Sequence, residues 1–188
     1  MIVYKKGNLF DFIHDGKYDI ILNFCNCFCK MDDGISLQFA HNFPEVLLAD
    51  INTVMGDKSK LGTYKYIKIE RFEKTFEVFN CYTQFAFTGY DLESTDDFDY
   101  EAFEKILQKL SVYSFKNRFC IPLVVSGQNG SDTERFLDLI RQYLSGHKVD
   151  IVLYDTQFIP KEYMSYKNKM LEFYQDISNK LKVFLAQF

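Results

Sequence analysis

Two asparagines, Asn23 and Asn26, stand three residues apart at the end of a short apolar run. Amide side chains both donate and accept hydrogen bonds, which suits a ligand that carries hydroxyl groups. A Met-Asp-Asp-Gly turn follows at residues 31–34, and helical spacing of apolar residues begins at Ile35. The free N–H groups of a helix N-terminus suit an anion. Residues 23–34 therefore predict either a site for a ligand with hydroxyl and phosphate groups or an ordinary strand-to-helix turn with capping side chains.

Cysteines offer a second kind of chemistry at the same place, because Cys25, Cys27 and Cys29 alternate along the chain. Alternation predicts that they share one face of a strand, where they are too near in sequence to pair comfortably. A zinc site needs further Cys or His residues at ligand spacing, and none follows. We therefore expect no metal site, and we interpret the five cysteines as reduced and mostly buried, as in a cytoplasmic protein.

The composition is that of a globular chain. Its 188 residues fit one domain with or without an appendage, and the apolar content of 47% is enough for a full core. The net charge of −4 is spread over mixed charges with no basic stripe, which argues against binding nucleic acid through phosphate contacts. Residues 1–7 lack the order of a signal peptide, and no apolar run approaches the ~20 residues of a membrane span.

Short apolar runs alternate with stretches of helical spacing. The predicted strands lie at residues 1–6, 20–25, 64–70, 75–83, 118–125 and 149–154. The predicted helices lie at residues 35–55, 98–110, 133–144 and 158–188, with Pro44 disturbing the first or beginning a new one and Gly146 ending the third. This alternation predicts an α/β fold with a mostly parallel sheet covered on both faces.

Three loops that carry Gly and Asn follow predicted strands, at residues 7–11, 23–34 and 126–132. Ligands bind at the carboxyl ends of the strands in such sheets. If the three loops converge, they line one cleft.

The order of motifs resembles that of the macro domain, the ADP-ribose-binding α/β/α module. The matching segments are residues 6–9, 23–39, 79–84 and 121–130, and the resemblance spans about residues 1–155. It is similar to the subgroup that includes ADP-ribose-1″-phosphate phosphatases and de-ADP-ribosylating macro domains. The resemblance implies a three-layer α/β/α domain at residues 1–155, followed by a C-terminal helical extension at residues 156–188.

The resemblance implies roles for matching positions. Asn8, next to Leu9, would face the adenine amino group, and Asn26 would bind the distal ribose hydroxyls and is the candidate catalytic residue. Gly34 and Ile35 would border the diphosphate on one side, and backbone N–H groups of residues 126–130 would wrap the other. The predicted ligand-binding residues are Asn8, Leu9, Asn23, Asn26, Gly34, Ile35, Ser126, Gly127, Gln128, Asn129, Gly130 and Tyr154, the last packing beside adenine.

Several positions depart from the family pattern. Asp32 and Asp33 replace two glycines, and a carboxylate near a diphosphate is repulsive. Gln84 and Asn129 stand where the deacylating members have a lysine and an aspartate, and Asn23 stands where one phosphatase-like type has a histidine. Because an amide is neither a base nor a Schiff-base former at neutral pH, a lysine-dependent mechanism is not expected.

Three functions stay open. The first is binding of ADP-ribose or a derivative, free or attached to a protein or nucleic acid. The second is hydrolysis of ADP-ribose-1″-phosphate or of an ADP-ribosylated macromolecule. The third is an interaction protein that uses an apolar stripe on its C-terminal helix, at residues 170–188, to bind a partner. No cofactor is implied, and the expected setting is the cytoplasm with no membrane contact.

Overall fold

A computed structural model describes residues 1–15, 17–71, 73–87, 98–124 and 132–153. The strands are β1 (Ile2–Lys6), β2 (Ile20–Asn26), β3 (Tyr64–Arg71), β4 (Lys74–Gln84), β5 (Arg118–Leu123) and β6 (Lys148–Leu153). The helices are α1 (Leu9–His14), α2 (Gly34–Asn42), α3 (Pro44–Ile51), the 3₁₀ turn η1 (Lys58–Lys60), α4 (Tyr100–Leu110) and α5 (Thr133–Leu144). The predicted helical extension and Tyr154 lie outside the described residues.

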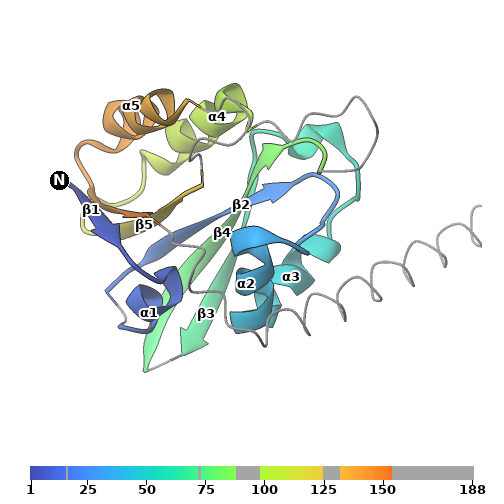
Figure 1. Ribbon diagram of the computed structural model, residues 1–188, viewed down its shortest axis with the longest axis horizontal. Coiled ribbons are helices and arrows are strands. Elements are labelled where there is room, and N and C mark those ends of the chain that lie inside the picture. Colours follow the sequence, from blue (N-terminus) through green and yellow to red (C-terminus); the bar gives the residue numbers. More distant parts are fainter. Residues whose placement is uncertain (16, 72, 88–97, 125–131, 154–188) are drawn as a thin grey trace, which may run out of the picture.

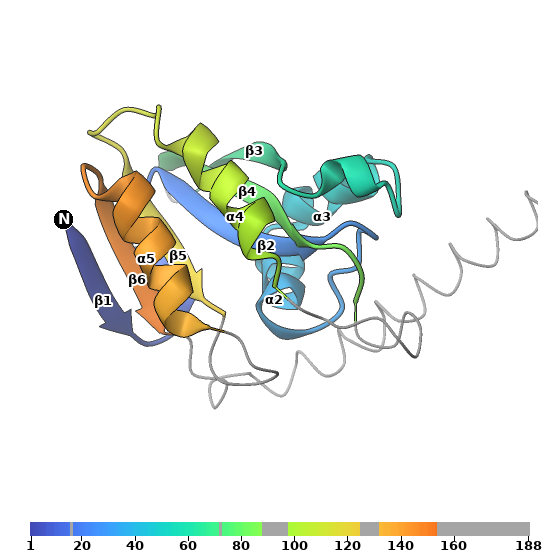
Figure 2. The same ribbon diagram turned by 90° about the horizontal axis from the view of Figure 1, so that it is seen from above.

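The six strands form one sheet in the order β1-β6-β5-β2-β4-β3. Every neighbouring pair is parallel except β3 and β4, which form an antiparallel pair. Helices α4 and α5 cover one face of the sheet, and α1, α2 and α3 cover the other (Figures 1 and 2). The predicted three-layer α/β/α architecture with a mostly parallel sheet is confirmed.

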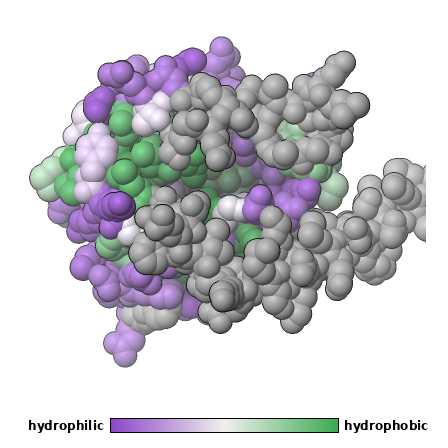
Figure 3. Space-filling model, in the orientation of Figure 1, coloured by the Kyte–Doolittle hydropathy of each residue, from purple (hydrophilic) through white to green (hydrophobic). Residues whose placement is uncertain are grey.

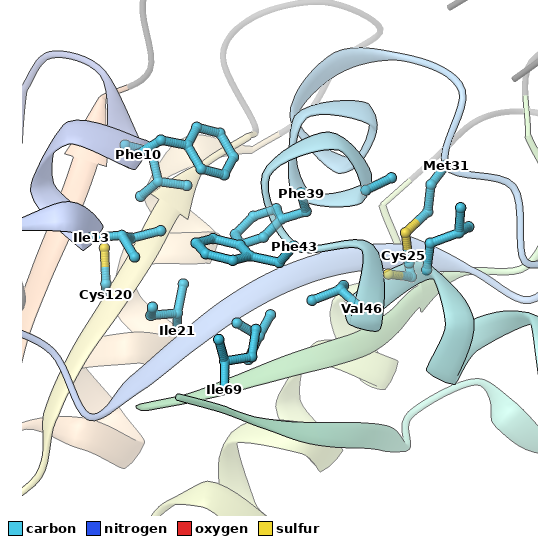
Figure 4. Packing of buried hydrophobic residues seen from close by; sticks show 14 of the residues in the cluster. Phe10, Ile13, Ile21, Cys25, Met31, Phe39, Phe43, Val46, Ile69 and Cys120 are labelled. Carbon is cyan, nitrogen blue, oxygen red and sulfur yellow. The ribbon is translucent and has the colours of Figure 1, made fainter. Parts of the chain in front are cut away.

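The apolar runs form strands because residues from both of their faces are buried. In β2, Ile21 and Cys25 pack toward α1, α2 and α3, while Ile20, Leu22 and Phe24 pack toward α4 and α5. Figure 4 shows the first of these cores, where side chains from α1, β2, α2, α3, β3 and β5 meet. Burying one side chain of this size contributes about 1.5–3 kcal/mol, so the two cores hold the three layers together.

Helices α4 and α5 are amphipathic. Each begins at an aspartate cap, since Asp99 accepts a hydrogen bond from the Ala102 N–H and Asp132 accepts one from the Arg135 N–H. Their apolar stripes are fully buried against the sheet, with the Phe103 and Phe136 rings stacked at 4.8 Å between centroids. Hydrophilic residues cover the rim of the molecule where these two helices lie (Figure 3).

The structure decides between the two alternatives for Pro44. The segment predicted as helical at residues 35–55 is two helices, because the backbone leaves helical geometry at Phe43 and Pro44 begins α3, which ends at Ile51. Helix α5 ends at Leu144, as predicted, and Ser145 is its C-cap in the right-handed region. Gly146 follows the cap and makes room for a ring, because a Cβ there would lie 2.8 Å from Phe115 Cε1.

Candidate functional site

The parallel strands all end at the same edge of the sheet. The chain leaves the neighbouring strands β2 and β5 in opposite directions at this edge. From β2 the chain continues to α2 on one face and then toward β3 and β4. From β5 it continues to α5 on the opposite face and then to β6. Neighbouring strands whose connections leave in opposite directions mark the topological switch point, which is where open α/β sheets bind ligands.

Strands β2 and β5 also separate from one another toward this edge. Within the described residues their register contains only the pairs Ile20–Phe119 and Ile21–Cys120, at the start of both strands. By contrast, β2 stays paired with β4 up to Asn26 and Gln84. The described halves of β2 and β5 nearest the carboxyl edge therefore form no register pairs with each other, and we call this carboxyl edge between the two strands the β2–β5 crevice.

Asn26 lies at the rim of this crevice and shapes the loop that follows it. Its side-chain oxygen accepts hydrogen bonds from the N–H groups of Phe28 and Lys30 at 3.0 and 3.2 Å. Its side-chain nitrogen donates to the Lys30 carbonyl oxygen at 2.8 Å. The amide therefore closes the turn at residues 26–30, and Cys29 takes a left-handed φ of 57° within it.

In the turn at residues 31–34, the negative charge of Asp32 is neutralised by Lys30, whereas Asp33 is exposed. Lys30 Nζ lies 3.1 Å from the Asp32 carboxylate and 3.8 Å from the centre of the Phe87 ring. Asp32 is only 16% exposed, so its negative charge is directed to the lysine rather than to the solvent. Asp33 is exposed and precedes α2 without a side-chain capping bond.

Gly34 begins α2 with φ of +56°, and open space surrounds the position of a Cβ there. This backbone conformation strongly favours glycine. Ile35 follows it and is half-buried against the core between the sheet and helices α1, α2 and α3. Gly34 thus places no side chain at the first position of α2, where an anion could approach the N–H groups of the helix N-terminus.

The loop after β1 ends at the same edge. The side chain of Asn8 caps α1 by accepting a hydrogen bond from the Phe10 N–H at 2.9 Å. Leu9 is fully buried, so only its backbone can reach a ligand. Contact between the rings of Phe10 in α1 and Phe39 in α2, at 5.1 Å, fixes this loop relative to the Asn26 loop.

Asn23 is placed differently from Asn26. It is fully buried in the middle of β2 and donates to the Asn80 side-chain oxygen at 2.9 Å. Asn80 in turn donates to the Val46 carbonyl oxygen at 2.9 Å. This pair of amides ties β2 and β4 to α3, beneath the carboxyl edge rather than on it.

Most of the loop predicted at residues 126–132 is not among the described residues. Ser126, Gly127, Gln128, Asn129 and Gly130 lie outside them, as does Tyr154, so their predicted roles stay predictions. The described part of the predicted cleft therefore consists of the loops after β1 and β2 and the end of β4.

Sequence reasoning missed a buried polar cluster under the Asn26 loop. Lys60, only 7% exposed, donates to the Cys27 carbonyl oxygen at 3.1 Å and to Thr53 Oγ1 at 2.6 Å. Its Nζ lies 3.6 Å from a carboxylate oxygen of Asp50, which also accepts a 2.8 Å hydrogen bond from the Tyr82 hydroxyl. Burial raises the pKa of Asp50, although Tyr82 and Lys60 oppose that shift. A lysine in the sequence Lys-Ser-Lys gives no sign of this burial.

The cysteines are free and buried, but one prediction about them was wrong. Only Cys25 belongs to the strand, whereas Cys27 and Cys29 lie in the turn after it, because the Asn26 bonds bend the chain there. Burial raises the pKa of Cys27 to about 11, so its thiol is protonated at neutral pH. Among the described residues, no group of three or more His, Cys, Asp and Glu is placed to hold a metal ion. None of the described helices is long and apolar enough to span a membrane.

Comparison with known proteins gives a relative in sequence from a phage. No family model matches the chain. The chain is 30% identical over 161 residues to an uncharacterized 17.5 kDa protein in the tk-vs intergenic region of Enterobacteria phage T4, which corresponds to 82% of the chain and 96% of that protein. The chain belongs to the same family as this phage protein.

Solved structures give the fold. The macrodomain of Thermus aquaticus DarG superposes with a TM-score of 0.61 at 18% identity, over 81% of this chain and 98% of its own. A macrodomain protein from Streptomyces coelicolor gives 0.58 at 19% identity, over 82% and 99%. The chain has the macrodomain fold. Thermosipho africanus DarTG, solved in complex with ADP-ribose, gives 0.58 at 14% identity, over 84% of this macrodomain and 43% of that chain.

In this macrodomain, Gln84 closes β4 directly opposite Asn26. The Cys27 N–H donates to the Gln84 carbonyl oxygen at 3.0 Å, which holds the start of the Asn26 loop against the end of β4. Two residues with amide side chains, Asn26 and Gln84, therefore stand at the described part of this edge, near one carboxylate that is paired with a lysine. Amide side chains do not act as bases at neutral pH.

Proposed function

We propose that this macrodomain binds ADP-ribose or a derivative of it across the β2–β5 crevice. The observation that carries the proposal is the loss of pairing between β2 and β5 toward the carboxyl edge, at the topological switch point. The Asn26 loop and the first turn of α2, which begins at Gly34, follow β2 at that edge. Support also comes from the fold, because the structurally similar Thermosipho africanus DarTG was solved with ADP-ribose.

We propose binding in preference to hydrolysis. Both side-chain polar atoms of Asn26 are engaged by the loop backbone, which suits a residue that shapes the turn more than one that orients water. Gln84 stands at the end of β4, and an amide does not act as a base at neutral pH. Asn8, Asn26, Gly34 and Ile35 are the described residues that we assign to the ligand. The five free cysteines fit a reducing compartment, and we propose a cytoplasmic setting on that ground.

Titration calorimetry with ADP-ribose tests the proposal. We expect a dissociation constant in the micromolar range, about −8 kcal/mol, and weaker binding of adenosine alone. Absence of heat and of a thermal shift at millimolar ADP-ribose would contradict it. Incubation with ADP-ribose-1″-phosphate and with ADP-ribosylated protein or DNA, followed by product analysis, separates the two readings, because turnover that disappears in Asn26→Ala would favour the hydrolase.

Matched variants locate the site. Asn26→Ala removes three hydrogen bonds from the loop and should reduce ADP-ribose affinity at least tenfold, a change of about 1.4 kcal/mol. Asn42→Ala is the control, since Asn42 is also an amide that bonds a carbonyl but lies at the opposite end of α2. Equal affinities in the two variants would place the ligand elsewhere.

A further inference from the structure

A thiol and an amine lie against each other beneath the Asn26 loop. Cys29 Sγ is 3.1 Å from Lys60 Nζ, and the two residues are 1% and 7% exposed. They come from separate elements, the turn after β2 and the 3₁₀ turn η1, and lie 31 residues apart in the sequence. The pair is buried and plays no part in the proposed binding site.

Two further side chains complete the cluster. Thr53 Oγ1 lies between the pair, 3.3 Å from Cys29 Sγ and 2.6 Å from Lys60 Nζ. Asp50 is fully buried, and its second carboxylate oxygen has no hydrogen-bond partner among the described residues. A hydroxyl that touches both reactive atoms and a carboxylate with an open oxygen are the groups that a proton transfer between thiol and amine needs.

We propose that Cys29 and Lys60 form a modification site at which hydrogen peroxide links the two side chains through a sulfur–nitrogen bond. Sulfenic acids condense with nitrogen nucleophiles in this way. The geometry favours the reaction at Cys29, because Lys60 contacts its sulfur directly, whereas it contacts the backbone carbonyl of Cys27.

The reaction balances in two steps. In the first, the Cys29 sulfur attacks peroxide, the O–O bond breaks, and the thiol becomes a sulfenic acid while one water leaves; sulfur is oxidised and peroxide is reduced. In the second, the Lys60 ammonium gives a proton to Asp50, and the neutral amine attacks sulfur. The S–O bond breaks, and the leaving hydroxide takes the second amine proton through Thr53 and departs as water.

The product suits a buried site because it leaves no charge there. Lys60 becomes a neutral sulfenamide nitrogen at the same time as Asp50 becomes a neutral acid. Modifying the lysine alone would leave the Asp50 carboxylate as an unpaired charge, which costs free energy in a low-dielectric interior. Burial also raises the pKa of the Cys29 thiol, so we expect oxidation to be slow and to need excess peroxide.

Mass spectrometry of the full-length chain tests the proposal. After hydrogen peroxide treatment and digestion, we expect a linked pair of peptides, one with Cys29 and one with Lys60, lighter than their sum by two hydrogen atoms. Dithiothreitol should restore the separate peptides. The same treatment in urea should give no such pair, because the contact exists only in the folded chain.

Variants identify the two atoms. Cys29→Ser and Lys60→Arg should each abolish the linked pair, and Cys29→Ser covers the case in which Lys60→Arg does not fold. Cys27→Ser and Lys58→Arg are the matched controls from the same two turns and should keep it. A disulfide from Cys29 to another cysteine, or Cys29 sulfinic acid beside an unmodified Lys60, would overturn the proposal. None of these readouts depends on ADP-ribose.

Discussion

Asp50 in α3 and Asp150 in β6 are both almost fully buried, at 0% and 2% exposure, but their surroundings move their pKa values in opposite directions. In the part of the chain that the structure describes, Asp50 pairs with one cation, Lys60, at 3.6 Å, and burial raises the pKa of Asp50. At Asp150 burial also acts to raise the pKa, but hydrogen bonds from Lys5, Tyr18 and Arg118 outweigh it and lower the pKa. Low solvent exposure alone therefore does not determine the direction of the pKa shift of a carboxylate, because the hydrogen bonds and charges around it also act on the pKa.

The positions of the cations sharpen this contrast. Lys5 and Arg118 each lie 2.7 Å from the same Asp150 oxygen, and their side chains are 23% and 33% exposed. Lys60 is 8% exposed at its side chain and has no route to solvent comparable to theirs. Asp150 therefore has two partly exposed cations, Lys5 and Arg118, whereas the one cation beside Asp50 among the described residues, Lys60, is buried.

The largest effect should come from removing the single cation. Lys60→Met leaves Asp50 without its ion pair and leaves the Cys27 carbonyl and the Thr53 hydroxyl without their donor. We expect a loss of about 3–5 kcal/mol in the free energy of unfolding, measured by urea denaturation at pH 7. Lys58→Met, in the same turn but exposed, should change it by less than about 0.5 kcal/mol. Equal effects would mean that Lys60 is not a buried partner.

Removing the other carboxylate should cost less. Asp150→Asn weakens three charged or hydroxyl contacts, but Lys5 and Arg118 can turn toward water. We expect a loss of about 2 kcal/mol by the same measurement. Asp138→Asn is the control, since Asp138 forms an exposed ion pair with Arg141 and should matter by less than about 0.5 kcal/mol. A loss as large as that of Lys60→Met would remove the contrast between the clusters.

The two aspartates should also give pH slopes of opposite sign. The lowered pKa of Asp150 contributes stability that is full above the unfolded value of about 3.9 and is lost as the pH falls through the folded value. The raised pKa of Asp50 means that stability is gained as the pH falls through its folded value toward about 3.9. Unfolding curves from pH 7 to pH 3 for wild type, Asp50→Asn and Asp150→Asn separate the two terms. The same slope in both differences would refute the assignment.

The smallest effect should come from one cation at the richer site. Lys5→Met leaves Arg118 at 2.7 Å from Asp150, so we expect a loss below about 1 kcal/mol. Differential scanning calorimetry resolves such a change when it is compared with Lys60→Met under the same conditions. A loss above that of Asp150→Asn would show that Lys5 does more than neutralise the carboxylate.

Most of the fold could be predicted from the sequence because the buried strands consist mainly of apolar residues. Runs such as Ile20–Ile21–Leu22 are buried on both faces of a parallel strand, and the stripes of α4 and α5 recur at helical spacing. The break at Pro44 was left open by the pattern, since proline both disturbs and begins helices. The alternation of Cys25, Cys27 and Cys29 predicted a strand, but the strand ends at Asn26, because the hydrogen bonds of the Asn26 side chain bend the chain into a turn.

The candidate site was predictable only in part. The motif containing Asn26 and Gly34 predicted the turn from β2 to α2, because Asx and Gly residues have local backbone roles that spacing reveals. The ligand-binding role of these residues stays a prediction. Asn23 has the same residue type but reaches the core, a difference that depends on its pairing with Asn80 across β4. Lys60 could not be found at all, since its burial arises from a loop 31 residues away.

The short pairing between β2 and β5 has a consequence for how the sheet moves as a whole. It divides the sheet into two three-stranded halves, with β2, β3 and β4 from residues 20–84 and β1, β5 and β6 from the chain on either side. Among the described residues this seam has two register pairs, so few backbone hydrogen bonds need to break for it to open, and we expect the halves to form separate cooperative units in native-state amide exchange. A ligand that spans the seam should join those units and slow exchange in both at once.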